Sequence, residues 1–232
     1  MYTNAESILG KWSEFKIRVD EQRPDIIGIT ESWCKNQPES PMYISREFLQ
    51  LENYVLIRKD ATDHRGSILL YIHQDIQAEE IEDIGENVSE AIWCKVKVNR
   101  ETHLIGCVYR KGTSTQDNNS ALSHVLNTIK ENYENFLIFG DFNLPNINWS
   151  TNLVANHTHQ YAAEFIEVLE QNFMHQHVNE PTRARGNNTP SILDLIITAD
   201  AQDVLDMKVN SPLGASDHAV LTWEYILGTE HN

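Results

Sequence analysis

The chain has 232 residues, of which 41% are hydrophobic, and it carries a formal net charge of −16. This length and apolar content suit a single domain over residues 1–232 that folds without disulfide bonds. The longest apolar runs fall well short of the roughly 18 residues that a membrane span needs, and the N-terminal residues do not resemble a signal peptide. We therefore expect an intracellular protein that is not secreted and has no membrane partner.

The acidic charge bears directly on nucleic-acid binding. A strongly negative protein repels the phosphate backbone at long range, which argues against non-specific DNA binding. At physiological salt the screening length is only about 8 Å, so a local basic rim can still contact phosphates. The three cysteines, Cys34, Cys94 and Cys107, form neither a metal-ligand pattern nor a disulfide framework. We expect them to be buried free thiols.

Hydrophobic periodicity predicts the elements of the first half of the chain. An amphipathic helix is predicted from Asn4 to Gln22, and Pro24 ends it. The predicted strands cover residues 25–31, 54–59, 67–73, 92–98 and 103–110. Residues 78–90 read as an acidic connection between strands. In the strand that follows, apolar residues alternate with Trp93 and two lysines, which predicts a half-exposed strand.

In the second half, helices are predicted over about residues 120–133 and 159–172. Four apolar residues, Phe136 to Phe139, predict a buried strand between them. Three more strands are predicted over residues 191–198, 206–210 and 217–226. Because strands outnumber helices and do not alternate strictly with them, we expect an α/β (α+β) fold. Its two packed sheets would carry helices on their outer faces.

Acidic and amide side chains stand within or at the ends of these apolar strands. They are Glu31, Asp141, Asn143, Asp194 and Asp217, the last followed by His218. A buried, unpaired carboxylate costs several kcal/mol, so an ordinary core avoids it. One such residue could be an edge position or a helix cap, but four placements on separate strands predict a shared site. Clustered carboxylates of this kind suit a hard divalent cation.

Six blocks of sequence resemble a known superfamily. In order they are TNA (3–5), DIIGITESW (25–33), CVYR (107–110), FGDFNLPNINW (139–149), PTRARGNNTPSILDLIIT (181–198) and SDHAVL (216–221). Together they resemble the endonuclease/exonuclease/phosphatase superfamily, and most closely the apurinic-endonuclease-like domain of non-LTR retrotransposons of the chicken-repeat-one and jockey kind. The resemblance extends over almost the whole chain. It implies a DNase I-like fold, a four-layer sandwich of two face-to-face mixed β-sheets flanked by helices.

The resemblance also implies phosphodiester hydrolysis with Mg²⁺ or Mn²⁺ and one activated water. Glu31 would be the principal metal ligand, and Asp217 a further ligand or a group that supports one. Asn4 would orient the metal or the scissile phosphate. Arg110, Arg183 and Arg185 are plausible phosphate contacts, although ordinary surface charge explains them equally well.

The remaining residues would carry out the proton chemistry. Asp141 would orient or deprotonate the water, and Asn143 and Tyr109 would donate hydrogen bonds to the phosphate. His218 would act as an acid/base or stabilise the developing charge, with Asp194 fixing its tautomer. A surface role for His218 and a core role for Tyr109 are the alternatives. We expect His175 and His177, which are spaced like residues on one strand face, to be structural or surface residues.

Three functions remain open. The first is a DNA endonuclease that nicks target DNA for retrotransposition, acting as a monomer, in the nucleus if its target is chromatin. A reverse transcriptase would be a partner only if the chain is part of a longer element. The second is a phosphodiesterase or phosphatase acting on another substrate, and the third a decayed or co-opted binding module. The third is supported by the acidic charge and by an apparently truncated first strand, since only three residues precede Asn4.

Overall fold

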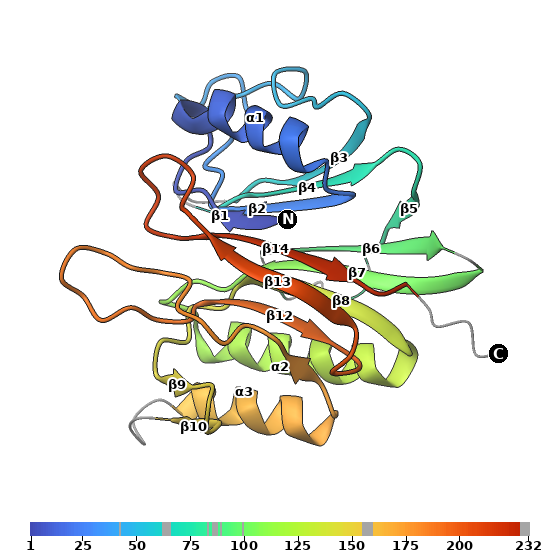
Figure 1. Ribbon diagram of the computed structural model, residues 1–232, viewed down its shortest axis with the longest axis vertical. Helices are drawn as coiled ribbons and strands as arrows, with labels where there is room; N and C mark the ends of the chain where they lie inside the picture. The colour runs from blue at the N-terminus through green and yellow to red at the C-terminus, as the bar shows by residue number, and fades with distance from the viewer. Residues whose placement is uncertain are drawn as a thin grey trace.

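The computed structural model describes residues 1–41, 43–61, 66–82, 84, 88, 90–98, 100–154 and 160–227. Two six-stranded sheets face each other, and helices cover their outer faces (Figure 1). Helix α1 lies outside one sheet, and α2 and α3 lie outside the other. The predicted four-layer sandwich is therefore confirmed. Within the described residues, no helix combines the length and apolarity that crossing a membrane requires.

The first sheet has the strand order β13-β14-β1-β2-β4-β3, and only its β1–β2 pair is parallel. In that order the strands are Val204–Asn210, Val220–Tyr225, Tyr2–Asn4, Ile26–Thr30, Ile68–His73 and Tyr54–Lys59. The sheet brings the N-terminal strand between two strands that are distant from each other in the sequence. This central position is what places Asn4 inside the molecule.

The second sheet has the order β11-β12-β8-β7-β6-β5, and only its β7–β8 pair is parallel. Its strands are His175–Gln176, Asp194–Thr198, Asn135–Asp141, Glu101–Tyr109, Ala91–Val98 and Gln77–Glu80. A small separate hairpin joins β9 (Ile147–Asn148) to β10 (Leu153–Val154). The long helix α2 (Gln116–Asn132) connects the parallel pair β7–β8, as a crossover between parallel strands requires.

The first helix is shorter than predicted. A 3₁₀ turn (Leu9–Lys11) precedes α1 (Trp12–Gln22), whose Trp12, Phe15 and Val19 are buried on one face of the helix. Residues before the turn continue alongside β2, with the Ala5 N–H donating to Thr30 O. These backbone bonds compete with helix formation, so the predicted start at Asn4 was wrong.

Other boundaries shifted for local reasons. Helix α2 begins at Gln116 because the Thr115 hydroxyl accepts a hydrogen bond from the Asn118 N–H, a helix N-cap. Helix α3 covers Gln160–Gln171; residue 159, where the prediction began, lies outside the described residues. The first residues of the predicted acidic connection form β5, and residues 83, 85–87 and 89 of it are not described.

Strand β6 is buried more fully than its alternation predicted. Trp93 is buried rather than exposed, because its ring lies against the side-chain-free face of Gly106, where a Cβ would come within 2.1 Å of the ring. The strand is paired on both sides, and its outer face lies in the core beneath the helices. The three cysteines are buried free thiols, as expected.

The first strand is short but complete in its pairing. Residues Tyr2 to Asn4 pair in parallel with β2, and Tyr2 also pairs with Leu221 of β14. Asn4 is fully buried. The short first strand therefore holds Asn4 inside the molecule, paired with Thr30 of β2.

Gly140 is the residue that allows β8 to end beside β7. Its φ is +150°, and a Cβ at this position would lie 1.8 Å from the Val108 carbonyl oxygen. We expect Gly140→Ala to lower the free energy of unfolding by about 3 kcal/mol, since backbone strain and overpacking combine. Urea unfolding measures this change. Gly10→Ala is the matched control, because its Cβ would meet nothing within 4 Å; equal stability of the two variants would contradict the expectation.

Candidate active site

The candidate site lies where both sheets present the ends of their central strands. In the second sheet, Asp194 pairs directly with Asp141, and Asp141 pairs with Tyr109, so that three predicted residues form a row across β12, β8 and β7. From the first sheet come Asn4 at the end of β1 and Glu31 directly after β2. The loop before β14 supplies Asp217 and His218. The topology thus gathers residues as distant in the sequence as Asn4 and His218.

Glu31 joins the two sheets through its carboxylate. Its Oε1 accepts hydrogen bonds from Asn4 Nδ2 at 3.0 Å and from the Tyr109 hydroxyl at 2.9 Å. Its Oε2 accepts from Trp33 Nε1 at 3.2 Å. Glu31 and Trp33 both have positive φ, +47° and +57°, a conformation that costs energy for residues other than glycine. Strain of this kind is typical of functional sites.

Asp141 is fully buried and held by two amides. Its Oδ2 accepts from Asn4 Nδ2 at 2.9 Å and from Asn143 Nδ2 at 3.0 Å, and its Oδ1 accepts from the Asn143 backbone N–H at 2.9 Å. Asn143 has a φ of +49°, and its Nδ2 also donates to Arg110 O at 3.0 Å. The spacing of the acid and the amide in Asp-Phe-Asn is thereby explained. Both hydrogens of this amide are used to hold Asp141 and the neighbouring backbone, not directed at a substrate.

His218 and Asp194 form a buried hydrogen-bonded pair. His218 Nδ1 lies 2.8 Å from Asp194 Oδ2. An ionised carboxylate only accepts, so Nδ1 carries the proton and donates it to Asp194. The other ring nitrogen, Nε2, lies 3.9 Å from Asp141 Oδ2 and 3.6 Å from Asp217 Oδ1. His218 is therefore surrounded by three carboxylates and is not a surface histidine.

The environment moves the pKa values of both central groups upward. Burial, followed by repulsion from Asp194, raises the pKa of Asp141 to about 7. Burial alone would lower the pKa of His218, but the charge and hydrogen bond of Asp194, with the charges of Asp141 and Asp217, raise it to about 9. Burial and the neighbouring Glu31 raise the pKa of Tyr109, which keeps its proton at neutral pH. The site therefore holds a cationic imidazole beside a carboxyl group that titrates near neutrality.

These shifts give a stability that depends on pH. A group whose pKa is raised by folding stabilises the protein below its unfolded-state pKa, and this contribution is lost as the pH rises through the folded-state value. For His218 the loss falls between about pH 6.5 and about 9 and is on the order of 3 kcal/mol. Asp141 contributes a loss of the same sign between about pH 4 and about 7.

We therefore expect the metal-free protein to have a lower free energy of unfolding at about pH 9 than at about pH 6. This decrease should be larger in the wild-type protein than in a His218→Gln variant. Urea unfolding in the presence of a chelator measures both differences. His175→Gln is the control, since His175 is exposed on β11. The same pH dependence in wild-type protein and the His218 variant would show that His218 does not carry it.

The three predicted arginines differ in their surroundings. Arg183 donates from Nε to Asp217 Oδ2 at 3.0 Å, and Arg185 is 66% exposed with its Nε 3.8 Å from the same oxygen. Both thus lie at the edge of the site. Arg110 does not: it donates to Asn119 Oδ1 and to the carbonyl oxygens of Phe142 and Asn143, and its guanidinium lies 4.9 Å from the Tyr161 ring centre.

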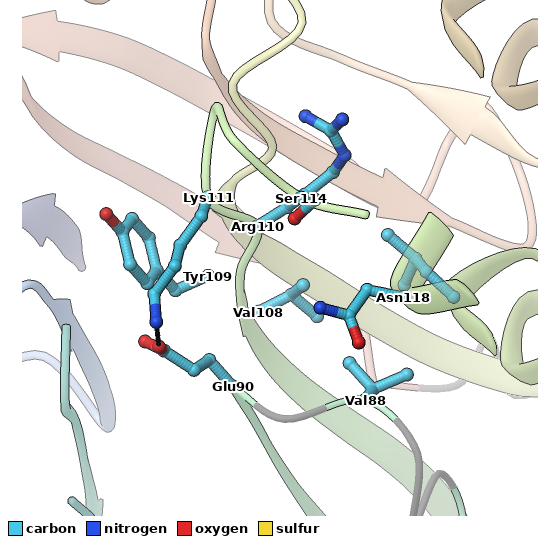
Figure 2. A pocket seen from close by; sticks show the side chains of 9 residues that line it. Val88, Glu90, Val108, Tyr109, Arg110, Lys111, Ser114 and Asn118 are labelled. Carbon is cyan, nitrogen blue, oxygen red and sulfur yellow. Dashed lines mark ion pairs between the residues drawn. The ribbon is translucent and has the colours of Figure 1, made fainter. Parts of the chain in front are cut away.

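Figure 2 shows Arg110 pointing away from Tyr109 and Lys111. Its predicted phosphate contact is therefore replaced by a structural role, the support of the loop that carries Asn143. Lys111, by contrast, points the same way as Tyr109 and forms an ion pair of 2.5 Å with the buried Glu90. These residues line a small cavity of about 60 Å³ beside the site.

Of the remaining residues, one has the structural role that was expected and two were not predicted from the sequence. His177 Nε2 lies 2.6 Å from Thr198 Oγ1 at the far end of β12, which agrees with a structural role. The hydroxyls of Tyr2 and Thr182 both contact Asp194, and neither was predicted. In the sequence, Tyr2 stands out only as one of the three residues before Asn4, and a tyrosine that faces a core carries no sequence signal for a polar contact.

The donor atoms fit a hard divalent cation. Asp217 Oδ1 is buried and, within the described residues, has no hydrogen-bond partner, although it faces the site. Asp141, Asp194 and His218 offer ligand atoms that all lie within 4.8 Å of one another. Both oxygens of Asp194 already accept hydrogen bonds, and His218 Nδ1 is bonded to one of them. Glu31 and Asp141 likewise accept hydrogen bonds on both oxygens, so within the described residues Asp217 Oδ1 is the site's carboxylate oxygen without a hydrogen-bond partner.

The endonuclease-reverse transcriptase family matches residues 103–222, which is more than half of the chain. The chain belongs to this family. This confirms the predicted endonuclease/exonuclease/phosphatase superfamily, and the fold is the one that apurinic endonucleases share. The family match over residues 103–222 includes Tyr109, Asp141, Asp194 and His218, whereas Asn4 and Glu31 lie outside it.

Solved structures of this superfamily share the whole fold. The endonuclease domain of TRAS1, a telomere-specific non-LTR retrotransposon, has a TM-score of 0.70 and 11% identity, over 97% of this chain and 96% of its own. The AP endonuclease LMAP from Leishmania major has a TM-score of 0.73 and 11% identity, over 97% and 87%. The 3′ phosphatase NExo from Neisseria, bound to a product DNA hairpin, has a TM-score of 0.69 and 13% identity, over 97% and 99%. Comparison with curated protein sequences gives no match.

Proposed function

We propose that the protein is a divalent-cation-dependent endonuclease that nicks DNA. The observation that carries the proposal is the arrangement of His218 between Asp194, Asp141 and Asp217, beside a separate carboxylate at Glu31. Phosphodiester hydrolysis needs a base for water, a source of positive charge for the phosphate and a site for a cation. The superfamily fold, which includes nucleases and phosphatases, supports the same reaction class.

Glu31 and Asp217 would hold Mg²⁺ or Mn²⁺, with Asn4 beside them. When bound, the cation neutralises charge on the phosphate and lowers the pKa of water. Asn4 donates to both Glu31 and Asp141, so it fixes the cation-binding carboxylate relative to the base. The chain's own groups provide the remaining chemistry.

Asp141 would accept the proton of the attacking water. Its pKa near 7 makes it a stronger base than an ordinary aspartate while leaving a large fraction ionised at neutral pH. Asn4 and Asn143 hold its two oxygens in one orientation. The protonated His218 would direct Nε2–H to the phosphate and stabilise its developing charge, and Tyr109 would remain a hydrogen-bond donor.

DNA is the proposed substrate. The support comes from the retrotransposon endonuclease domain and the DNA-bound phosphatase that share the fold. Arg183 and Arg185 would contact phosphates at the edge of the site, against the acidic background of the molecule. Acting on target DNA as a monomer, such an enzyme would work in the nucleus if its target is chromatin.

Nicking of supercoiled plasmid by the purified protein with Mg²⁺ tests the proposal. EDTA and an Asp141→Ala, His218→Ala double variant are the controls. Nicking that disappears in both controls would support the endonuclease and its site together. A folded protein that nicks neither intact nor abasic plasmid would overturn the DNA substrate. In that case, hydrolysis of a simple phosphodiester would indicate an enzyme that acts on another substrate. A protein that hydrolyses no phosphodiester would indicate a binding module.

A further inference from the structure

A tyrosine hydroxyl lies at the back of the candidate site. Tyr2 of β1 is fully buried, and its hydroxyl lies 3.0 Å from Asp194 Oδ1 and 2.8 Å from Thr30 Oγ1. Asp194 uses its other oxygen, Oδ2, to accept the hydrogen bond of His218. Tyr2 therefore reaches from the first sheet across the core to the carboxylate of the second.

The direction of these hydrogen bonds follows from the chemistry of the groups. A carboxylate accepts only, so the single hydroxyl proton of Tyr2 is donated to Asp194. Thr30, the residue before Glu31, must then donate its own proton to the Tyr2 oxygen. Burial, and then the charge of Asp194, raise the pKa of Tyr2, which keeps it protonated. The chain of donors runs from Thr30 through Tyr2 to Asp194.

Packing fixes the position of this hydroxyl. Tyr2 is paired on both sides, with Gly28 of β2 and Leu221 of β14. Its ring packs edge-on against the Phe139 ring in the core between the sheets. The two ring centroids are 5.9 Å apart, and the angle between the ring planes is 62°. Phe139 in turn fills the space that a side chain at Gly28 would need. A ring confined in this way holds its hydroxyl at one place.

We propose that Tyr2 is a positioning residue: it locks the Asp194 carboxylate in the rotamer that holds the His218 ring toward Asp141. Thr182 accepts hydrogen bonds from the backbone N–H groups of Leu193 and Asp194, so it fixes the main chain there. Only Tyr2, within the described residues, donates to the second carboxylate oxygen. The catalytic consequence rests on the proposed hydrolysis, whereas the effect on the histidine ring does not.

Tyr2→Phe removes the hydroxyl and keeps the ring. We expect kcat for plasmid nicking to fall roughly 10-fold with KM unchanged, as for other groups that orient a catalytic side chain. The low-field proton resonance of His218 Nδ1–H should shift or broaden at a fixed neutral pH. In an Asp194→Asn background, Tyr2→Phe should have no further effect on kcat, because the carboxylate it orients is gone.

Tyr71→Phe is the matched control. Tyr71 is equally buried and donates to Leu49 O at 2.9 Å, in the core beneath α1 rather than between the sheets. It should lose stability comparably without changing kcat or the His218 resonance. An unchanged resonance and kcat in Tyr2→Phe would overturn the inference. The resonance is read without substrate, so if the wild-type protein fails to nick DNA, the proposed function falls while the resonance still decides the role of Tyr2.

Discussion

Replacing His218 by alanine should slow plasmid nicking by about 10²–10⁴-fold, the range that one positioned acid/base or charged group contributes. The physical reason is the arrangement of charges. In the wild-type protein a protonated imidazole faces Asp141 and Asp217 and is bonded to Asp194. Its removal takes away the positive side chain that lies between these three carboxylates, and with it the group that would stabilise the phosphate.

The same substitution should also alter stability, and the experiment must separate the two effects. Without the imidazolium, buried carboxylates repel one another at short range, which destabilises the fold at neutral pH. Single-turnover rates should therefore be measured where urea unfolding shows that both proteins are folded. His175→Ala, at an exposed position of β11, should nick at the wild-type rate. A folded His218→Ala protein with wild-type activity would exclude the proposed role.

Several residues of the site could be predicted because their position contradicts ordinary core composition. Asp141 and Asp194 stand in apolar strands and pair directly with each other, an arrangement that costs energy unless a function or a cation compensates for it. Glu31 was recognisable for the same reason. In each case the signal was a polar residue in an apolar context, and such a signal survives in a single sequence.

Other features depend on contacts that only the fold creates. Arg110 follows Tyr109 in a basic motif, yet strand alternation turns it toward α2 and Tyr161. In the sequence, Tyr2 cannot be distinguished from any other core aromatic residue. Its contact with Asp194 arises only because the fold packs β1 against β12. Trp93 appeared exposed because its alternation with lysines suggested a solvent-facing side, but Gly106 on the neighbouring strand provides space for its ring. These outcomes depend on partners from distant parts of the chain.

Glu31→Gln should weaken binding of Mg²⁺ or Mn²⁺ by about 100-fold or more, because affinity for a hard cation depends strongly on the number of charged oxygen ligands. The substitution keeps the shape of the side chain. Its amide oxygen can still accept from Asn4 and Tyr109, so these two contacts should be retained, while the hydrogen bond from Trp33 Nε1 and one negative charge are lost.

Thermal unfolding gives a readout that requires no substrate. A ligand that binds only the folded state stabilises it, by about 2.7 kcal/mol at 100 times its dissociation constant. Mg²⁺ or Mn²⁺ should therefore raise the unfolding temperature of the wild-type protein and leave that of Glu31→Gln almost unchanged. Glu79→Gln on the exposed strand β5 removes the same charge from the surface and should behave like the wild type. If the cation raised the unfolding temperature of Glu31→Gln and wild type equally, Glu31 would not be a cation ligand. A group other than a cation at Glu31 would then have to neutralise the phosphate while Asp141 acts as the base.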